Sequence, residues 1–278
     1  TVPGCGSGLF SAAPAPAAAA RPSAPGLRRI RETGAGRTFE RLAPNVLRLD
    51  ACVVCKPGAR AVRRRYPQPY WQVFDDYQAR RVIPQFLGDV PVDSRVLCRE
   101  FRYAFAFRCA SGVAAPRLVL HPRSARGRFR VWLNGRPASG VREFPLERTQ
   151  PLAVPLAALR AGRNRLELRF EANSAMDGVL CPLFIEGDFD VEVARRGDAT
   201  LLPSGARVSG AGWKAMGLPH YMGDGRYRWE EQLTAEEARQ VKALELARVV
   251  DSAQLRVNGR SAGTRAWAPW RWGLRGLR

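Results

Sequence analysis

The chain has 278 residues, enough for one or two domains with buried cores, and 46% of them are hydrophobic. It contains no run of 18 apolar residues, which argues against a transmembrane helix, and Leu9–Ala20 lacks the basic leader of a signal peptide. The net charge of +20 comes mostly from arginines spread along the chain, because only Lys56, Lys214 and Lys242 are lysines. Nucleic-acid binders more often concentrate their charge beside aromatic platforms, so we expect a basic solvated surface without a nucleic-acid or membrane partner.

The first 40 residues are rich in Ala, Pro, Gly and Arg and show little periodicity, which predicts a linker or a partly disordered segment at 1–40. A first β-sandwich is expected at 41–200. Its first strand begins near Asn45 and leads into L-D-A-C-V-V-C, and a strand would place Cys52 and Cys55 on opposite faces. That geometry is poor for zinc. We expect the six cysteines to be mostly buried free thiols, with a disulfide as the open alternative.

Tyr70–Arg81 has the spacing of a helix, whose aromatic stripe we expect to face a core. From Glu100 the pattern changes to short strands separated by Gly, Pro and Asn, which is typical of an antiparallel sandwich. We expect Phe101, Tyr103, Phe105 and Phe107 on one strand, with Phe105 and Phe107 buried and the arginines outward. Further strands are expected at 117–121, 129–133, 151–156, 166–170, 179–185 and 189–193, with a single helical turn at 156–159.

One sequence pattern occurs twice. V-W-L-N-G-R-P-A-S-G at 131–140 returns in degenerate form as L-R-V-N-G-R-S-A-G-T at 255–264. Asn-Gly between strand-like segments predicts a two-residue hairpin, because both residues tolerate the positive φ of a type I′ turn. Two distant copies indicate two β-domains of one type.

Thirty residues after Asn134, A-G-R-N-R-L-E-L-R-F forms a turn and a strand with alternating apolar residues at 166, 168 and 170. The equivalent of this element in the second copy would lie beyond Arg278. We therefore expect the chain to be a piece of a larger protein that is cut inside its second domain, 201–278. In that domain we expect strands at 225–232, 242–249 and 254–257, and a short helix capped by Thr234.

These landmarks resemble the galactose-binding-like jelly-roll domains of large bacterial glycoside hydrolases. Such domains are best known as the sugar-binding domain of family 2, and they also occur in the C-terminal part of α-L-rhamnosidase-like enzymes. The similarity rests on N-V-L-R-L-D at 45–50, V-W-L-N-G-R at 131–136, L-R-A-G-R-N-R-L-E-L at 159–168, F-I-E-G-D-F-D-V at 184–191, G-L-P-H-Y-M-G-D-G-R-Y at 217–227 and L-R-V-N-G-R-S-A-G-T-R-A-W-A-P-W at 255–270. It implies an all-β chain of tandem galactose-binding-like jelly-roll sandwiches, the second truncated, and an upstream catalytic domain on the same polypeptide. It supplies no catalytic residue here.

Glycosidic hydrolysis needs two positioned carboxylates, and the candidates are Glu186, Asp188 and Asp190, with Glu230 and Glu231 further on. We interpret the first three as solvent-facing or arginine-paired strand charges. The catalytic motifs of serine hydrolases, nucleotide phosphatases and zinc proteases are absent from the sequence. No cofactor is expected, and a structural calcium ion has no loop motif to support it.

Sugar binding needs aromatic faces and polar edges. Trp267, Trp270 and Trp272 offer faces, and Tyr221 and Arg260 offer polar edges. The alternative is that these tryptophans pack inside the sandwich or against a neighbouring domain. We expect a non-catalytic carbohydrate-binding or scaffolding region of a glycoside hydrolase that acts on plant or bacterial polysaccharides. A structural or adhesive β-module remains the alternative. The location would be extracellular or periplasmic if the parent protein is secreted, and cytoplasmic otherwise.

Overall fold

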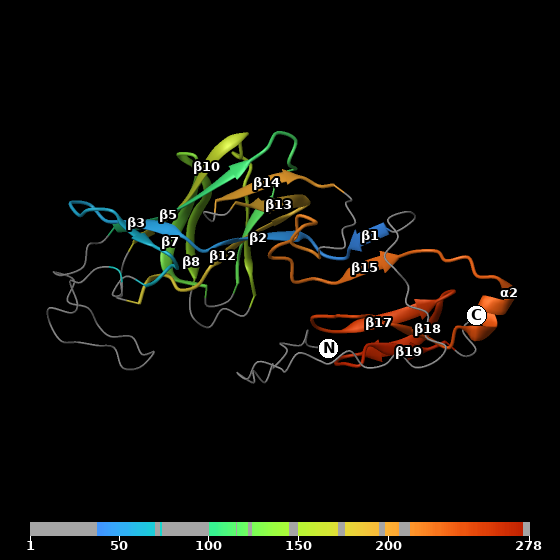
Figure 1. Ribbon diagram of the computed structural model, residues 1–278. Coiled ribbons are helices and arrows are strands. Elements are labelled where there is room, and N and C mark those ends of the chain that lie inside the picture. The colour runs from blue at the N-terminus through green and yellow to red at the C-terminus, as the bar shows by residue number, and fades with distance from the viewer. Residues whose placement is uncertain are drawn as a thin grey trace. The chain divides into compact units, whose positions relative to one another are not determined.

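The computed structural model describes residues 38–69, 73, 100–114, 116–121, 124–144, 150–171, 176–194, 198–205 and 212–274 (Figure 1). The chain divides into two compact units, one of residues 36–229 and one that joins 1–35 to 230–278. Both consist mainly of strands in their described parts, and the fold is all-β, as the sequence predicts.

The large sheet of the 36–229 unit has nine strands around the central pair β5 and β10, which run antiparallel over their whole length. Its strands are β3 (Cys52–Cys55), β4 (Val62–Arg64), β5 (Glu100–Cys109), β7 (Ala125–Leu133), β8 (Arg136–Phe144), β10 (Gly162–Glu171), β11 (Gly178–Val179), β13 (Phe189–Val193) and β14 (Ala199–Pro203). The contact between β14 and β5 is the parallel one.

A second, four-stranded sheet has the order β2-β12-β6-β9. Its strands are β2 (Asn45–Leu49), β6 (Arg117–Leu120), β9 (Leu152–Pro155) and β12 (Leu183–Gly187). Leu47, Leu118 and Ile185 from this sheet are fully buried in one hydrophobic cluster with Phe105 and Leu168 from the large sheet. The two sheets therefore form a β-sandwich around a single core.

Strand β5 confirms the period-two prediction. Phe105 and Phe107 are 1% and 2% exposed, whereas Arg102 and Arg108 point outward. Phe101 stacks on Phe170 of β10 with ring centroids 5.2 Å apart. The alternating residues of the two longest strands thus supply much of the aromatic core.

Both Asn-Gly turns have the predicted conformation. Asn134 and Gly135 have φ of 53° and 81°, and Asn258 and Gly259 have φ of 48° and 76°. The first turn joins β7 to β8, and the second joins β17 (Ala253–Val257) to β18 (Arg260–Arg265). The predicted turn at 156–159 also forms, closed by a 3.3 Å bond from the Leu159 amide to the Leu156 carbonyl.

Asn134 and Asn164, thirty residues apart, touch each other. The Asn134 Nδ2 donates to Asn164 Oδ1 at 2.8 Å, and the Arg165 amide donates to Asn134 Oδ1 at 2.9 Å. Asn164 is fully buried and also bonds the main chain of Arg160 on both its amide and its carbonyl. The thirty-residue spacing of Asn134 and Asn164 therefore corresponds to two turns that are hydrogen-bonded to each other.

The described part of the second unit holds a short helix and four strands in two pairs. Helix α2 (Ala235–Gln240) has the predicted cap, in which Thr234 and Glu237 bond each other's backbone amides. Strand β16 (Ala243–Glu245) pairs with β19 (Arg271–Gly273), and β17 pairs with β18. The structure gives β16 three residues where the sequence predicts a strand over 242–249.

Two expected boundaries differ from the structure. The expected division at 200/201 falls inside β14, whose Leu201 is fully buried and whose register pairs it with β5 and β13. The expected linker at 1–40 overlaps β1 (Thr38–Arg41), which pairs with β15 (Gly225–Arg228). The β1–β15 and β14–β5 pairings join distant segments, so the local composition at either boundary does not predict them. The rest of the linker and nearly all of the predicted helix at 70–81 lie outside the described residues.

Candidate functional site

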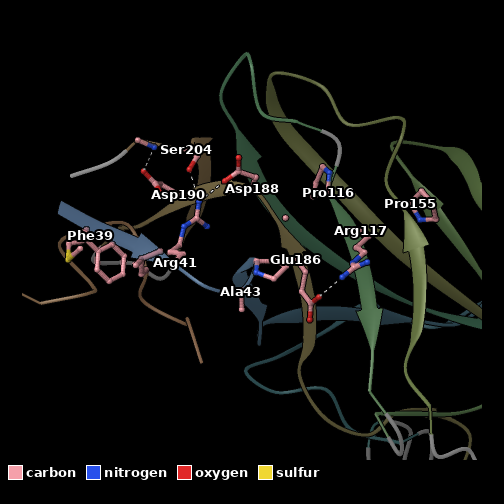
Figure 2. Close-up of a pocket in the computed structure, with 15 residues that line it drawn as sticks. Phe39, Arg41, Ala43, Pro116, Arg117, Pro155, Glu186, Asp188, Asp190 and Ser204 are labelled. Atoms are coloured by element: carbon pink, nitrogen blue, oxygen red, sulfur yellow. Dashed lines mark hydrogen bonds and ion pairs between the residues drawn. The ribbon is translucent and has the colours of Figure 1, made fainter. Parts of the chain in front are cut away.

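A cavity of about 800 Å³ lies in the 36–229 unit, and the three carboxylates of E-G-D-F-D line it (Figure 2). Its apolar walls include Phe39, Pro116 and Met216. If the candidate carboxylates acted as a catalytic pair, the substrate would have to bind in this cavity.

The carboxylates lie where the chain leaves the small sheet for the large one. Glu186 is in β12, Asp190 is in β13, and Asp188 is in the bend between them. Gly187 permits this corner, because a Cβ at that position would lie 2.9 Å from the Phe189 ring. Glu186, Asp188 and Asp190 therefore lie where the chain turns sharply from the small sheet into the large one.

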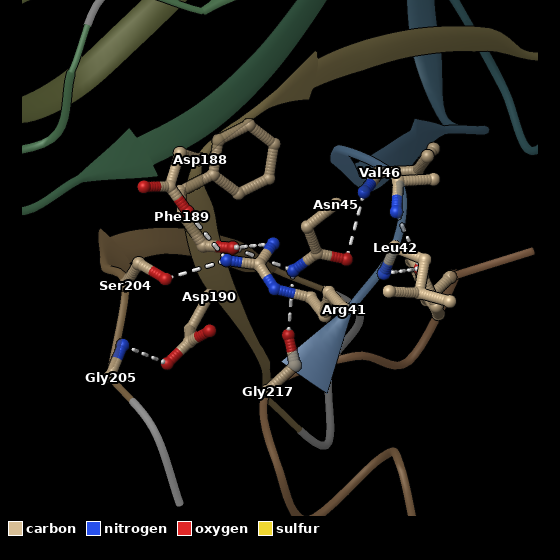
Figure 3. Close-up of polar contacts among 12 residues, drawn as sticks. Arg41, Leu42, Asn45, Val46, Asp188, Phe189, Asp190, Ser204, Gly205 and Gly217 are labelled. Carbon is tan, nitrogen blue, oxygen red and sulfur yellow. Dashed lines mark hydrogen bonds and ion pairs between the residues drawn. The ribbon is translucent and has the colours of Figure 1, made fainter. Parts of the chain in front are cut away.

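Arg41 holds the corner from β1 (Figure 3). Its guanidinium donates to Asp188 Oδ1 at 2.6 Å, to Ser204 Oγ at 2.6 Å and to the Phe189 carbonyl at 3.2 Å. The Arg41 side chain is only 13% exposed, while that of Asp188 is 77% exposed. Asp188 therefore pairs with a largely buried guanidinium that also bonds Ser204 and the Phe189 carbonyl.

The other two carboxylates also have partners. Arg117 approaches Glu186 Oε2 at 3.4 Å, and the Gly205 amide donates to Asp190 Oδ2 at 2.9 Å. Figure 2 shows the Arg117–Glu186 pair on neighbouring strands, apart from the Arg41 contacts. A glycosidase acid and base must face one scissile bond from two sides. Asp188 and Glu186 have arginine partners, which is one of the two arrangements expected of these strand charges, and Asp190 has a backbone partner.

The four residues that the sequence predicts for substrate binding are divided between the two units. Tyr221 belongs to the 36–229 unit and is buried. Its hydroxyl donates to the Asp224 carbonyl at 2.6 Å and accepts from the amides of Leu42 and Ala43. Tyr221 thus anchors a chain crossing, and all of its hydrogen-bonding capacity is used there.

The remaining three predicted residues belong to the 230–274 segment and have different environments. Trp267 is 77% exposed and lines a groove of about 460 Å³. Trp270 is half-buried, and Arg260 is exposed at the Asn-Gly hairpin; neither lines the groove. Trp272 is 1% exposed and donates from Nε1 to the Gly263 carbonyl at 2.9 Å, which agrees with the packing alternative for this tryptophan.

Three basic residues of this groove were missed by the sequence prediction. Lys242, Arg265 and Arg271 line it together with Trp267, Ala268 and Pro269. Arg271 belongs to the W-A-P-W-R-W segment and Arg265 lies two residues before it, so their positions in the chain offered a signal. Lys242 arrives through the β16–β19 pairing, which only the fold reveals.

The cysteines and histidines of the described ranges show no sign of a metal site. Those ranges hold no group of three or more His, Cys, Asp or Glu side chains that could bind a metal ion. Cys52, Cys55, Cys109 and Cys181 are free thiols, and burial raises the pKa of Cys52 to about 12. Burial, and secondarily the Arg48 guanidinium, lower the pKa of His220, so this imidazole is neutral near pH 7.

As to membranes, no helix in the described segments combines the length and hydropathy that spanning a bilayer requires.

The described fold defines this protein as an all-β sandwich protein with a second, smaller β-unit. No protein-family model matches the chain, and a search of curated proteins found no match. Among solved structures it is similar to a GH2 β-galacturonidase from Eisenbergiella tayi, at 13% identity and a TM-score of 0.35 over 58% of this chain and 28% of that one. It is also similar to a β-D-mannosidase from Dictyoglomus thermophilum, at 12% identity and a TM-score of 0.35, covering 53% and 23% of the two chains.

A rhamnosidase from a Novosphingobium species is similar at 15% identity and a TM-score of 0.31, covering 58% of this chain and 16% of that one. The chain thus spans between 16% and 28% of the length of these neighbours.

Proposed function

We propose that this chain is a non-catalytic carbohydrate-binding region of a glycoside hydrolase, and that the Trp267 groove is its binding surface. The observation that carries the proposal is the 77% exposure of Trp267 in a groove, whereas Trp272 of the same segment is buried. Large aromatic side chains seldom stay in water without a partner, and a flat indole face matches the apolar face of a sugar ring. A volume of about 460 Å³ lies within the usual range of small-ligand sites.

Two further points support the proposal. The six sequence elements at 45–270 resemble galactose-binding-like domains in their order, and the described fold is the β-sandwich that such a resemblance implies. The carboxylates of the large cavity are engaged by Arg41, Arg117 and the Gly205 amide. Those engagements favour a module whose parent protein carries the catalytic carboxylates in another domain.

The test measures binding of the 278-residue chain to a panel of neutral and acidic polysaccharides by affinity electrophoresis and tryptophan fluorescence. Trp267→Ala should weaken binding at least about tenfold, which corresponds to ~1.4 kcal/mol of lost contact. Tyr66→Ala is the matched control, because Tyr66 is 48% exposed with the Arg65 guanidinium 5.4 Å from its ring. This control should bind like the unmodified chain.

Binding to no polysaccharide, or binding that Trp267→Ala leaves unchanged, would favour the structural or adhesive module instead. A panel of aryl glycosides tests the non-catalytic part. We expect no release of the aryl group, and release that disappears in Glu186→Gln or Asp188→Asn would show that the large cavity is an active site.

A further inference from the structure

The charged residues that line the Trp267 groove are all positive. Its ionisable lining residues are Lys242, Arg265 and Arg271, and no carboxylate is among the lining residues. All three side chains belong to exposed residues beside the exposed indole of Trp267. A concave site lined by cations attracts anions, because its low-dielectric walls concentrate the field.

Main-chain contacts fix the walls of this groove in place. The Leu246 amide donates to the Trp270 carbonyl at 2.9 Å, and the Leu274 amide donates to the Lys242 carbonyl at 2.9 Å. Arg265 Nε donates to the Arg271 carbonyl at 3.2 Å, which ties the end of β18 to β19. A site whose walls are already ordered loses little conformational entropy when a ligand binds.

We propose that the groove selects a carboxylate-bearing saccharide, with a uronate ring on the Trp267 face and its carboxylate between Arg265, Arg271 and Lys242. This specificity rests on the proposed carbohydrate-binding function and narrows it to acidic sugars. Guanidinium groups suit this role because their planar N–H donors match the two oxygens of a carboxylate.

The observations favour a saccharide over a nucleic acid strand. A strand-binding groove follows the backbone over several nucleotides and stacks successive bases on several aromatic side chains. Here a single tryptophan lines a groove of about 460 Å³, which has room for a short stretch of ligand. Nucleic acid therefore serves as a competing outcome of the test.

One carboxylate, Glu245, lies next to a cation of the groove. Glu245 lies directly opposite Arg271 in the β16–β19 register, is exposed, and does not line the groove. Its negative charge should weaken the attraction of Arg271 for an anion. Removing that charge should therefore strengthen binding, which is an effect that general damage to the fold would not produce.

The experiment compares polygalacturonate with the same polymer fully methyl-esterified, using the full chain at low and high salt. The esterified form has the same rings without the charge. We expect polygalacturonate to bind at least tenfold more tightly, and the difference to shrink in high salt because screening weakens exposed charge pairs. Arg271→Gln and Lys242→Gln should each lower this affinity about three- to tenfold, and Glu245→Gln should raise it about twofold.

Arg256→Gln is the matched control, since Arg256 is an exposed arginine of the same unit on β17 and does not line the groove. It should change the affinity less than twofold. Equal binding of both polymers through Trp267 would overturn the acidic specificity while leaving carbohydrate binding intact. Binding of neither polymer would also overturn it, and the neutral panel would then decide the proposed function. Tighter binding of a 20-nucleotide oligothymidylate, with the same dependence on Trp267 and Arg271, would assign the groove to nucleic acid.

Discussion

At the scale of single residues, turn glycines and asparagines decide where the strands meet. Asn134 and Asn258 both adopt positive φ, which asparagine tolerates better than most residues. Asn164 acts differently, because its buried side chain accepts from the Arg160 amide and donates to the Arg160 carbonyl. A buried amide with several partners is costly to replace, because each partner that is left unpaired loses its hydrogen bond without regaining water.

Substitutions at two glycines of the 36–229 unit can distinguish the cost of backbone strain from the cost of steric crowding. Gly135 and Gly217 have φ of 81° and 80°, but a Cβ on Gly135 would meet nothing within 4 Å, whereas one on Gly217 would lie 2.7 Å from the Cβ of Asp190. We expect Gly135→Ala to cost about 1 kcal/mol of unfolding free energy, from backbone strain alone. Gly217→Ala should cost about 3 kcal/mol, because crowding adds to the same strain.

Denaturant unfolding of the two variants side by side measures this difference. Equal losses of stability would show that the chain near Asp190 relaxes to accept the extra methyl group. The Gly217 carbonyl accepts from Asn45 Nδ2 and the Val191 amide, so such relaxation would also disturb those two bonds.

At the scale of elements, the β1–β15 ribbon depends on its attachments to the sandwich. A two-stranded ribbon alone is marginally stable in water. Arg41 attaches it through Asp188, Ser204 and the Phe189 carbonyl, and Tyr221 holds the following residues through the Leu42 and Ala43 amides. Asp188 thus helps to attach the β1–β15 ribbon to the sandwich, and the sequence around it does not indicate this role.

Arg41→Gln should therefore loosen the ribbon selectively. We expect amide hydrogen exchange in β1 and β15 to accelerate roughly tenfold or more, since the lost charge-assisted bonds contribute about 1–3 kcal/mol. Exchange in β5 and β10 should not change. Arg226→Gln is the control, because its 3.0 Å pair with Glu40 is exposed and contributes little. An equal effect of both variants would contradict the assignment of Arg41 as the anchor.

At the scale of the whole molecule, the two units differ in how much core they contain. The 36–229 unit buries a continuous cluster drawn from both sheets, with Phe105, Phe129 and Phe170 among its largest members. In the described part of the second unit the buried hydrophobic residues are Ala243, Leu244, Leu255 and Trp272. Stability follows the apolar area removed from water, so the second unit should open more readily.

Hydrogen exchange tests this difference within one chain. Amides around Val257 in β17 should exchange much faster than those around Leu168 in β10, at the same pH and temperature. Comparable protection at the two places would mean that the second unit has stabilising contacts beyond its small described core.

Local chemistry by itself determined much of this protein. Alternation in β5 and β10, both Asn-Gly turns and the Thr234 capping box were predictable, because each depends on residues that are close in sequence. For the carboxylates near Asp188 the sequence left solvent exposure and arginine pairing open, and the structure pairs Asp188 with Arg41.

Only the tertiary structure decided which tryptophan is buried and which is exposed. Trp267 and Trp272 belong to one short segment of the chain, yet the β16–β19 pairing buries Trp272 and leaves Trp267 beside Lys242 and Arg271. The β1–β15 and β14–β5 pairings likewise join segments far apart along the chain, and they moved the expected domain boundary. Such contacts arise from burying surface between distant segments, and no local propensity specifies that choice.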